Sequence, residues 1–159
     1  MDILTAKGQI TVEQEAEAGV MFEAATGYRY VNTPKNKPAV VDALLIQDGV
    51  LGAIAETKCR MMSLADFDGF DYQWLVTFDK IIKAKQLSEM LCVPLVGILY
   101  LVPDKTLLYR RITNADGSWA CNFHTEDTQT QATVNGGKAV RKNTFIDMSD
   151  ARILKGCNI

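Results

Sequence analysis

The stretch VDALLIQDGVLGAIAETKCR, residues 41–60, decides how this chain folds. It consists of two mostly apolar runs around the turn-forming residues 47–49, and this pattern predicts a β-hairpin with strands over residues 39–46 and 50–59. Asp42, Glu56 and Lys58 lie inside the apolar runs. Because burying a charged group in a protein core is costly, these three residues need an explanation.

The length of the hairpin loop determines which way the charged side chains point. A two-residue loop, 48–49, sends Asp42 to the face of the sheet opposite Glu56. A three-residue loop, 47–49, is a type I turn followed by a bulge with glycine last. That loop brings Asp42, Glu56 and Lys58 to one face, because side chains alternate along a strand. Both loops suit the sequence, and a plain two-residue turn without a compensating bulge would keep the charges apart.

Two carboxylates that lie close together in a partly buried place repel each other, and a divalent cation relieves the repulsion. Mg²⁺ prefers oxygen ligands and commonly takes one or two carboxylates plus waters and a substrate phosphate. Lys58, two residues from Glu56, would reach the same cluster. An amine there can orient or deprotonate a water, or stabilise charge on a phosphate. The pattern therefore predicts a phosphodiester hydrolysis site.

The rest of the chain predicts the order helix, strands, helix, strands. A helix over 12–26 is expected to begin at an N-cap, Thr11, and to end before Gly27. Residues 60–73 have no clean period and predict a loop, whereas 74–91 have helical spacing. Further strands are predicted over 28–31, 94–102, 106–113, 119–123, 143–148 and 151–154, with a turn at 135–137.

This order predicts one α/β domain over residues 1–159, in which helices flank a central mixed sheet. The core is expected over about residues 12–110. The strands within residues 119–156 are not assigned a position in the sheet.

Asp42, followed after thirteen residues by Glu56-Thr57-Lys58 at the end of a buried strand, resembles the PD-(D/E)XK nuclease superfamily, with its restriction-endonuclease-like fold. The likeness covers residues 12–102. It implies Mg²⁺, for which Mn²⁺ substitutes, held by Asp42, Glu56 and the main-chain carbonyl of Thr57. It also implies that Lys58 assists the attacking water, so that Asp42, Glu56 and Lys58 form the catalytic set.

The same resemblance implies further site residues on two predicted helices. Members often add a glutamate from the preceding helix, and Glu17 matches this metal ligand best, with Glu13 as the alternate. Gln86-Leu87 is similar to the Gln-Leu pair of exonuclease-like members. Residues that would contact the site, a phosphate or DNA are Gln86, the nearby Lys80, Lys83 and Lys85, and Lys35 and Lys37. The residue before Asp42 is Val41, where the family pattern has proline.

The resemblance implies a Mg²⁺-dependent DNA nuclease, a structure-selective endonuclease of DNA repair or recombination, with DNA as partner and a homodimer as one form. It covers both resolvase-like and RecB-like exonuclease-like members, so a DNA end-processing exonuclease is an alternative. A non-cleaving nucleic-acid-binding module on the same fold is another. Phe70, Tyr72 and Trp74 would stack on a base or, as is commoner for aromatic residues, pack in the core.

Composition narrows the class of protein. The 159 residues have a formal net charge of −2, which argues against coating nucleic acid through bulk charge. The longest apolar run, 93–102, has half the roughly 20 residues of a membrane span, and the first residues lack a signal-peptide layout. We therefore expect a soluble, cytoplasmic protein without a membrane partner. Four cysteines without a CxxC pair and a single histidine, His124, argue against a zinc site.

Overall fold

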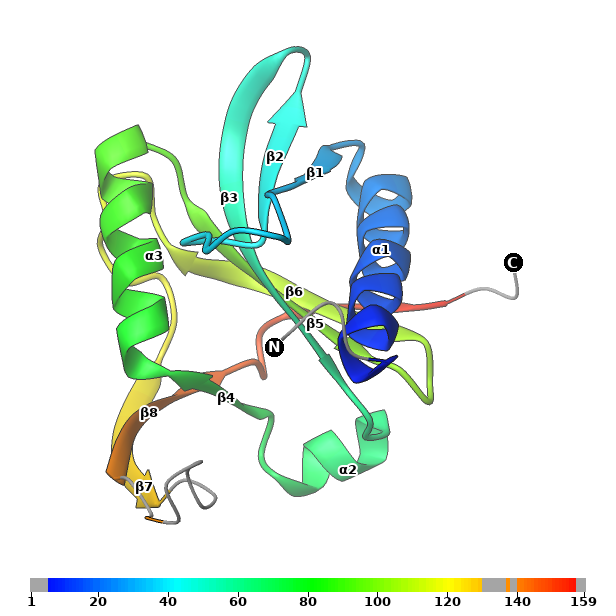
Figure 1. Ribbon diagram of the computed structural model, residues 1–159, viewed down its shortest axis with the longest axis vertical. Helices are drawn as coiled ribbons and strands as arrows, with labels where there is room; N and C mark the ends of the chain where they lie inside the picture. Colours follow the sequence, from blue (N-terminus) through cyan, green and yellow to red (C-terminus); the bar gives the residue numbers. More distant parts are fainter. Residues whose placement is uncertain (1–5, 130–136, 138–139, 157–159) are drawn as a thin grey trace.

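The computed structural model describes residues 6–129, 137 and 140–156 (Figure 1). Within these residues the chain forms three helices and nine strands. The helices are α1 (Ala6–Thr26), α2 (Leu64–Gly69) and α3 (Phe78–Leu91). The strands are β1 (Arg29–Asn32), β2 (Ala43–Gln47), β3 (Val50–Arg60), β4 (Gln73–Thr77), β5 (Leu95–Leu101), β6 (Thr106–Thr113), β7 (Phe123–Gln129), β8 (Val140–Asp147) and β9 (Arg152–Lys155).

A six-stranded mixed sheet forms the centre, in the order β1-β2-β3-β5-β6-β9. Its strands pair antiparallel except for β3 and β5, which run parallel over residues 54–60 and 95–101. The strand β5 is almost entirely buried, as expected for an apolar strand covered on both faces. The predicted α/β class, with a mixed sheet flanked by helices, is confirmed.

Helices cover both faces of this sheet (Figure 1). On one face α1 packs with Ala18, Met21 and Phe22, all buried in one apolar cluster with residues of β2, β3, β5 and β6. On the other face Ile81 and Ala84 of α3 join a second cluster with further side chains of the sheet. A separate three-stranded sheet, β4-β8-β7, lies beside α3. No helix in the described ranges is long and apolar enough to cross a bilayer.

The first helix starts earlier than its sequence pattern suggests. Thr11 lies inside α1, which already includes residue 6, so the predicted N-cap at Thr11 is wrong. The predicted end is confirmed, because α1 stops at Thr26 and Gly27 adopts a φ of +78°. This left-handed conformation favours glycine, and the Gly27 amide closes the last turn onto the Glu23 carbonyl at 2.9 Å.

Residues 60–91 differ most from the sequence-based expectation. The predicted loop contains α2, which Ser63 and Asp66 begin with a capping box. The first residues of the predicted second helix form β4, in which Trp74 and Val76 are buried with the alternation of a strand. Pairing with β8, some 70 residues later in the chain, overrides the local helical spacing.

The C-terminal strands are only partly as predicted. Around residue 119 there is an isolated bridge between Trp119 and Thr113, and β7 begins at Phe123. The closing strands correspond to β8 and β9, and β9 adds to the central sheet beside β6. The predicted turn at 135–137 falls largely outside the described residues.

The hairpin between β2 and β3 decides between the two loops that the sequence allows. Gln47 pairs with Val50, so the loop is the two-residue Asp48-Gly49, and the three-residue loop is wrong. Both loop residues have positive φ, 53° and 74°, as in the type I′ turn that suits Asp-Gly.

A bulge then restores the alignment that the two-residue loop would lose. Ile46 pairs with Leu51, but Leu45 pairs with Ala53, so Gly52 is an extra residue in β3. A Cβ at Gly52 would lie 2.8 Å from Cε1 of Tyr28, so the close approach of that ring requires glycine. The bulge shifts the register by one residue, which is the compensation that the charged residues need to come together.

Candidate functional site

Asp42 lies where the chain enters β2, at the point where β3 loses its β2 partner. Its main-chain N–H donates to the Ala55 carbonyl at 2.9 Å, and its carboxylate Oδ2 accepts the Thr57 N–H at 2.8 Å. The first bond fixes the Asp42 backbone beside β3, and the second holds the Asp42 carboxylate against the main chain of β3. Beyond this point β5 is the one strand among the described residues that pairs with β3, so the other edge of β3 faces side chains from helices and loops.

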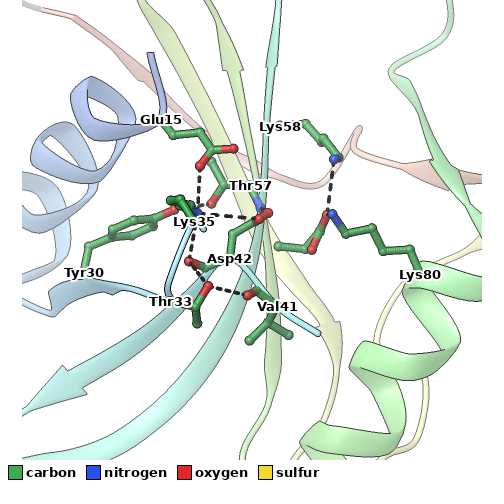
Figure 2. A network of polar contacts seen from close by, with 10 residues as sticks. Glu15, Tyr30, Thr33, Lys35, Val41, Asp42, Thr57, Lys58 and Lys80 are labelled. Carbon is green, nitrogen blue, oxygen red and sulfur yellow. Dashed lines mark hydrogen bonds and ion pairs between the residues drawn. The ribbon is translucent and has the colours of Figure 1, made fainter. Parts of the chain in front are cut away.

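A cavity of about 290 Å³ opens at this edge, and we call it the site cavity. It gathers residues from α1, the loop after β1, the start of β2, the end of β3 and α3. Its lining residues are Thr11, Val12, Glu15, Lys35, Asp42, Thr57, Lys58, Cys59, Arg60 and Lys80. Figure 2 shows Asp42 and Thr57 between Glu15 and Lys35 on one side and Lys58 and Lys80 on the other.

Glu56 is the most buried charged residue of this group, with a side chain that is 0% exposed. Its Oε1 contacts Lys80 Nζ at 2.9 Å and Lys58 Nζ at 3.5 Å. Its Oε2 is buried and has no hydrogen-bond partner among the described residues. Burial, followed by the negative charge of Asp42, raises the pKa of Glu56 to about 7, although both lysines act to lower it. The carboxylate is thus held in a state that an added cation would stabilise.

The pKa values of the two lysines beside Glu56 are shifted in opposite directions. Burial lowers the pKa of Lys58, the positive charge of Lys80 adds to this, and Glu56 opposes it. Burial also acts to lower the pKa of Lys80, but the negative charges of Glu56 and Asp42 outweigh it and the pKa is raised. Lys58 is therefore the amine that more readily gives up a proton, and Lys80 is the amine that stays protonated.

On the other side of Asp42, Lys35 bridges two carboxylates (Figure 2). Its Nζ lies 2.9 Å from Glu15 Oε2 and 3.8 Å from Asp42 Oδ1, and it donates to the Asp42 carbonyl oxygen at 3.4 Å. The ammonium group thus occupies the place between acidic oxygens that a metal cation would take. Below them, the Tyr30 hydroxyl and Thr57 Oγ1 share a buried hydrogen bond of 2.7 Å.

The α1 carboxylate at the site cavity is Glu15, neither Glu17 nor Glu13. Glu17 Oε1 accepts the Tyr100 hydroxyl at 2.6 Å and lies 4.0 Å from Lys105 Nζ, away from the site cavity lining, and Glu13 is exposed. One signal in the sequence points to Glu15. It lies three and seven residues before Ala18 and Phe22, so it shares their buried face of the helix.

The predicted phosphate contacts on α3 and in the loop are spread over a wider surface. Lys83 lines a second cavity of about 350 Å³ together with Lys80, next to residues 39–40. Gln86 is exposed on α3, nearly two turns beyond Lys80, and Lys37 is exposed in the loop after Lys35. Of the predicted contacts, Lys35 and Lys80 reach the acidic residues in this structure.

The acidic residues fit a divalent cation by their chemistry. In the described part of the chain no three acidic, histidine or cysteine side chains already form a metal-binding group. Mg²⁺ does not need one, since it commonly uses one or two carboxylates and fills its shell with water and phosphate. The orphaned, buried Oε2 of Glu56 and the nearby Asp42 supply such a pair.

A larger cavity of about 500 Å³ lies elsewhere, near Phe22, Tyr109 and Arg152, and it includes none of the predicted site residues. Both lysines with shifted pKa values line the site cavity, and the orphaned Glu56 carboxylate lies behind them in contact with both, so the site cavity has the stronger chemical case. No protein-family model matches the chain, and no curated protein matches it.

Proposed function

We propose that this protein is a Mg²⁺-dependent nuclease that hydrolyses phosphodiester bonds of DNA. The observation that carries the proposal is the buried Glu56 carboxylate, which contacts Lys58 and Lys80, two residues that line the site cavity together with Asp42. Acidic oxygens and amines in one half-enclosed site match the needs of phosphodiester hydrolysis, where negative charge accumulates on a phosphate. The likeness of this set to the PD-(D/E)XK superfamily supports the same reaction.

The acidic residues would hold the cation. Asp42 and Glu56 would be its ligands, together with the main-chain carbonyl of Thr57, and Mn²⁺ would substitute for Mg²⁺. When bound, the cation supplies an activated water and neutralises charge on the phosphate. Glu15 takes the role that the family resemblance assigns to a helix glutamate, because Lys35 links it to Asp42.

The lysines would divide the remaining work. Lys58, whose pKa is lowered, would orient or deprotonate the attacking water. Lys80 keeps its charge against Glu56 and would stabilise negative charge on the phosphate. Lys35 would leave its place between Glu15 and Asp42 when the cation arrives, and would then contact the DNA backbone along with Lys37 and Lys83.

A cleavage panel tests the proposal. The full chain is incubated with single-stranded, duplex, nicked, flapped and four-way DNA, and with RNA, in Mg²⁺, in Mn²⁺ and in EDTA. We expect metal-dependent cleavage of DNA, faster on branched or flapped DNA than on continuous duplex. Binding of DNA without cleavage of any substrate in either metal would instead identify a non-cleaving module on this fold.

A further inference from the structure

A cavity of about 410 Å³ adjoins the site cavity on the side of α2 and β4, and Arg60 lines both. We call it the aromatic pocket, because Phe67, Phe70, Trp74 and Phe145 line it. Unlike the site cavity, which charged residues dominate, this pocket is mainly apolar. Asp42 and Lys58 line the site cavity and not the aromatic pocket, so Arg60 is the residue that connects the two cavities.

One of the residues that line the aromatic pocket, Trp74, has an unsatisfied polar group. Trp74 is only 2% exposed, and its indole Nε1 has no hydrogen-bond partner among the described residues. A buried donor without an acceptor costs free energy, so an acceptor on a ligand would be favoured there.

The rim of the aromatic pocket presents further flat surfaces. Phe70 follows α2 and is 64% exposed, so one face of its ring is accessible to a ligand at the aromatic pocket. His124 of β7 stacks on Phe145 of β8, with ring centroids 4.9 Å apart and an interplanar angle of 9°. Arg60 uses one N–H to donate to the Cys59 carbonyl at 3.2 Å and has four others, since a guanidinium has five.

We propose that the aromatic pocket binds one unpaired nucleobase of the DNA substrate, next to the phosphate in the site cavity. A base has flat faces that stack on aromatic rings and a polar edge with acceptors for a donor such as Trp74 Nε1. Arg60 would contact the backbone between base and phosphate. This inference rests on the proposed nuclease function and narrows its substrate to DNA with an unpaired nucleotide, such as a bulge or a flap.

The test measures binding of the full chain to two DNAs of the same sequence. One has 2-aminopurine as a single-nucleotide bulge, and the other has it paired in a continuous duplex. Phe70→Ala removes an exposed ring and should fold normally. Met90→Ala, which removes another exposed side chain on α3 outside the aromatic pocket, is the matched control.

For the wild type we expect tighter binding of the bulged DNA, with quenched 2-aminopurine fluorescence as the base stacks. Phe70→Ala should weaken binding of the bulged DNA by roughly 5- to 150-fold and leave duplex binding unchanged, because one stacked base contributes about 1–3 kcal/mol. Trp74→Phe keeps a ring and removes the N–H, and should weaken bulge binding by roughly 3- to 10-fold. Met90→Ala should bind both DNAs as the wild type does.

Equal effects of Phe70→Ala on both DNAs, or no effect on either, would overturn the aromatic pocket's role. Cleavage in Mg²⁺, measured separately, distinguishes this failure from that of the nuclease proposal. A wild type that cleaves DNA but shows no bulge preference and no quenching refutes the base pocket alone. A wild type that captures the base and cleaves nothing supports the aromatic pocket and refutes the nuclease.

Discussion

Lys35 and Glu15 form an ion pair, with 2.9 Å between Nζ and Oε2, at the mouth of the site cavity. The same ammonium lies 3.8 Å from Asp42 Oδ1. It neutralises two acidic groups from different parts of the chain, α1 and the start of β2. A positively charged side chain thus stands where the proposed function requires a cation.

Lys35→Met should therefore raise the affinity for Mn²⁺ or Mg²⁺ in the absence of DNA. Removing the ammonium frees both carboxylates and leaves their repulsion for the metal to relieve. We expect a roughly 3- to 10-fold tighter dissociation constant by isothermal titration calorimetry, since a partly exposed ion pair contributes about 1 kcal/mol. Lys37→Met, two residues away and exposed, is the control and should leave the affinity unchanged. Equal or weaker metal binding by Lys35→Met would contradict competition for the cation's place.

The raised pKa of Glu56 predicts a pH dependence of stability. Its pKa rises from 4.5 to about 7 on folding, so the folded state binds more protons between these values. The free energy of unfolding should then fall as pH rises through this range, by about 3 kcal/mol, and stay level above it. Urea unfolding at pH 5 and pH 8 in EDTA measures the fall.

Glu56→Gln isolates this effect, because it removes the titrating group and keeps the shape of the side chain. The variant should lose most of the difference in stability between pH 5 and pH 8. Mg²⁺ added at pH 8 should stabilise the wild type, since a ligand that binds only the folded state raises the free energy of unfolding. An equally steep pH dependence in the variant would show that Glu56 is not its source.

The bulge at Gly52 predicts a sharp response to a single methyl group. In Gly52→Ala the new Cβ would lie 2.8 Å from Cε1 of Tyr28, so the ring or the strand must move. We expect a loss of about 1–3 kcal/mol in stability and a loss of cleavage, because Asp42 and Glu56 depend on this register.

Gly69→Ala is the matched control, because nothing lies within 4 Å of its added Cβ, and its stability should be close to that of the wild type. Gly52→Ala combined with Tyr28→Ala should lose less stability than the sum of the two single changes, as residues in contact do. Strict additivity would argue that the ring does not set the requirement for glycine.

Much of the site follows from the sequence because its three central residues belong to one hairpin. The alternation of apolar residues around Asp42 and Glu56 predicts two strands, and the spacing of Glu56 and Lys58 places both on one face. The hairpin loop is harder to predict, because two signals disagree there. Asp48-Gly49 indicates a two-residue turn, whereas clustering of the charged residues requires a register that this turn alone does not give. The bulge at Gly52 reconciles the two-residue turn with the clustered charges. It depends on the ring of Tyr28, which lies between α1 and β1, so the sequence around Gly52 gives no sign of it.

The missed features share a dependence on distant residues. The strand β4 exists because β8 pairs with it, and the short run of residues 73–77 looks helical when read with the helix that follows. The sequence alone does not single out Glu15, because packing of α1 on the sheet determines which face of the helix is buried. Its relation to Ala18 and Phe22 identifies it once that face is known.

Glu15 and Glu17 offer a direct comparison of the two helix carboxylates. Glu15→Gln should weaken metal binding and reduce the cleavage rate by about tenfold or more, because Glu15 lines the site cavity. Glu17→Gln should change either quantity by less than about twofold, since Glu17 contacts Tyr100 instead. A larger effect of Glu17→Gln than of Glu15→Gln would reverse the assignment.

The most direct test of the proposed function is the rate of cleavage of supercoiled plasmid DNA in Mg²⁺ by the wild type, Asp42→Asn, Lys58→Met and Lys155→Met. The first two variants remove a proposed ligand and the amine that handles the water, so each should slow cleavage by about 100-fold or more. Lys155 is exposed on β9 and does not line the site cavity, so Lys155→Met should retain most of the wild-type activity. EDTA should abolish cleavage by the wild type and by Lys155→Met. Undiminished cleavage by Asp42→Asn and Lys58→Met, or wild-type cleavage that persists in EDTA, would contradict the assignment of this site as a metal-dependent nuclease centre.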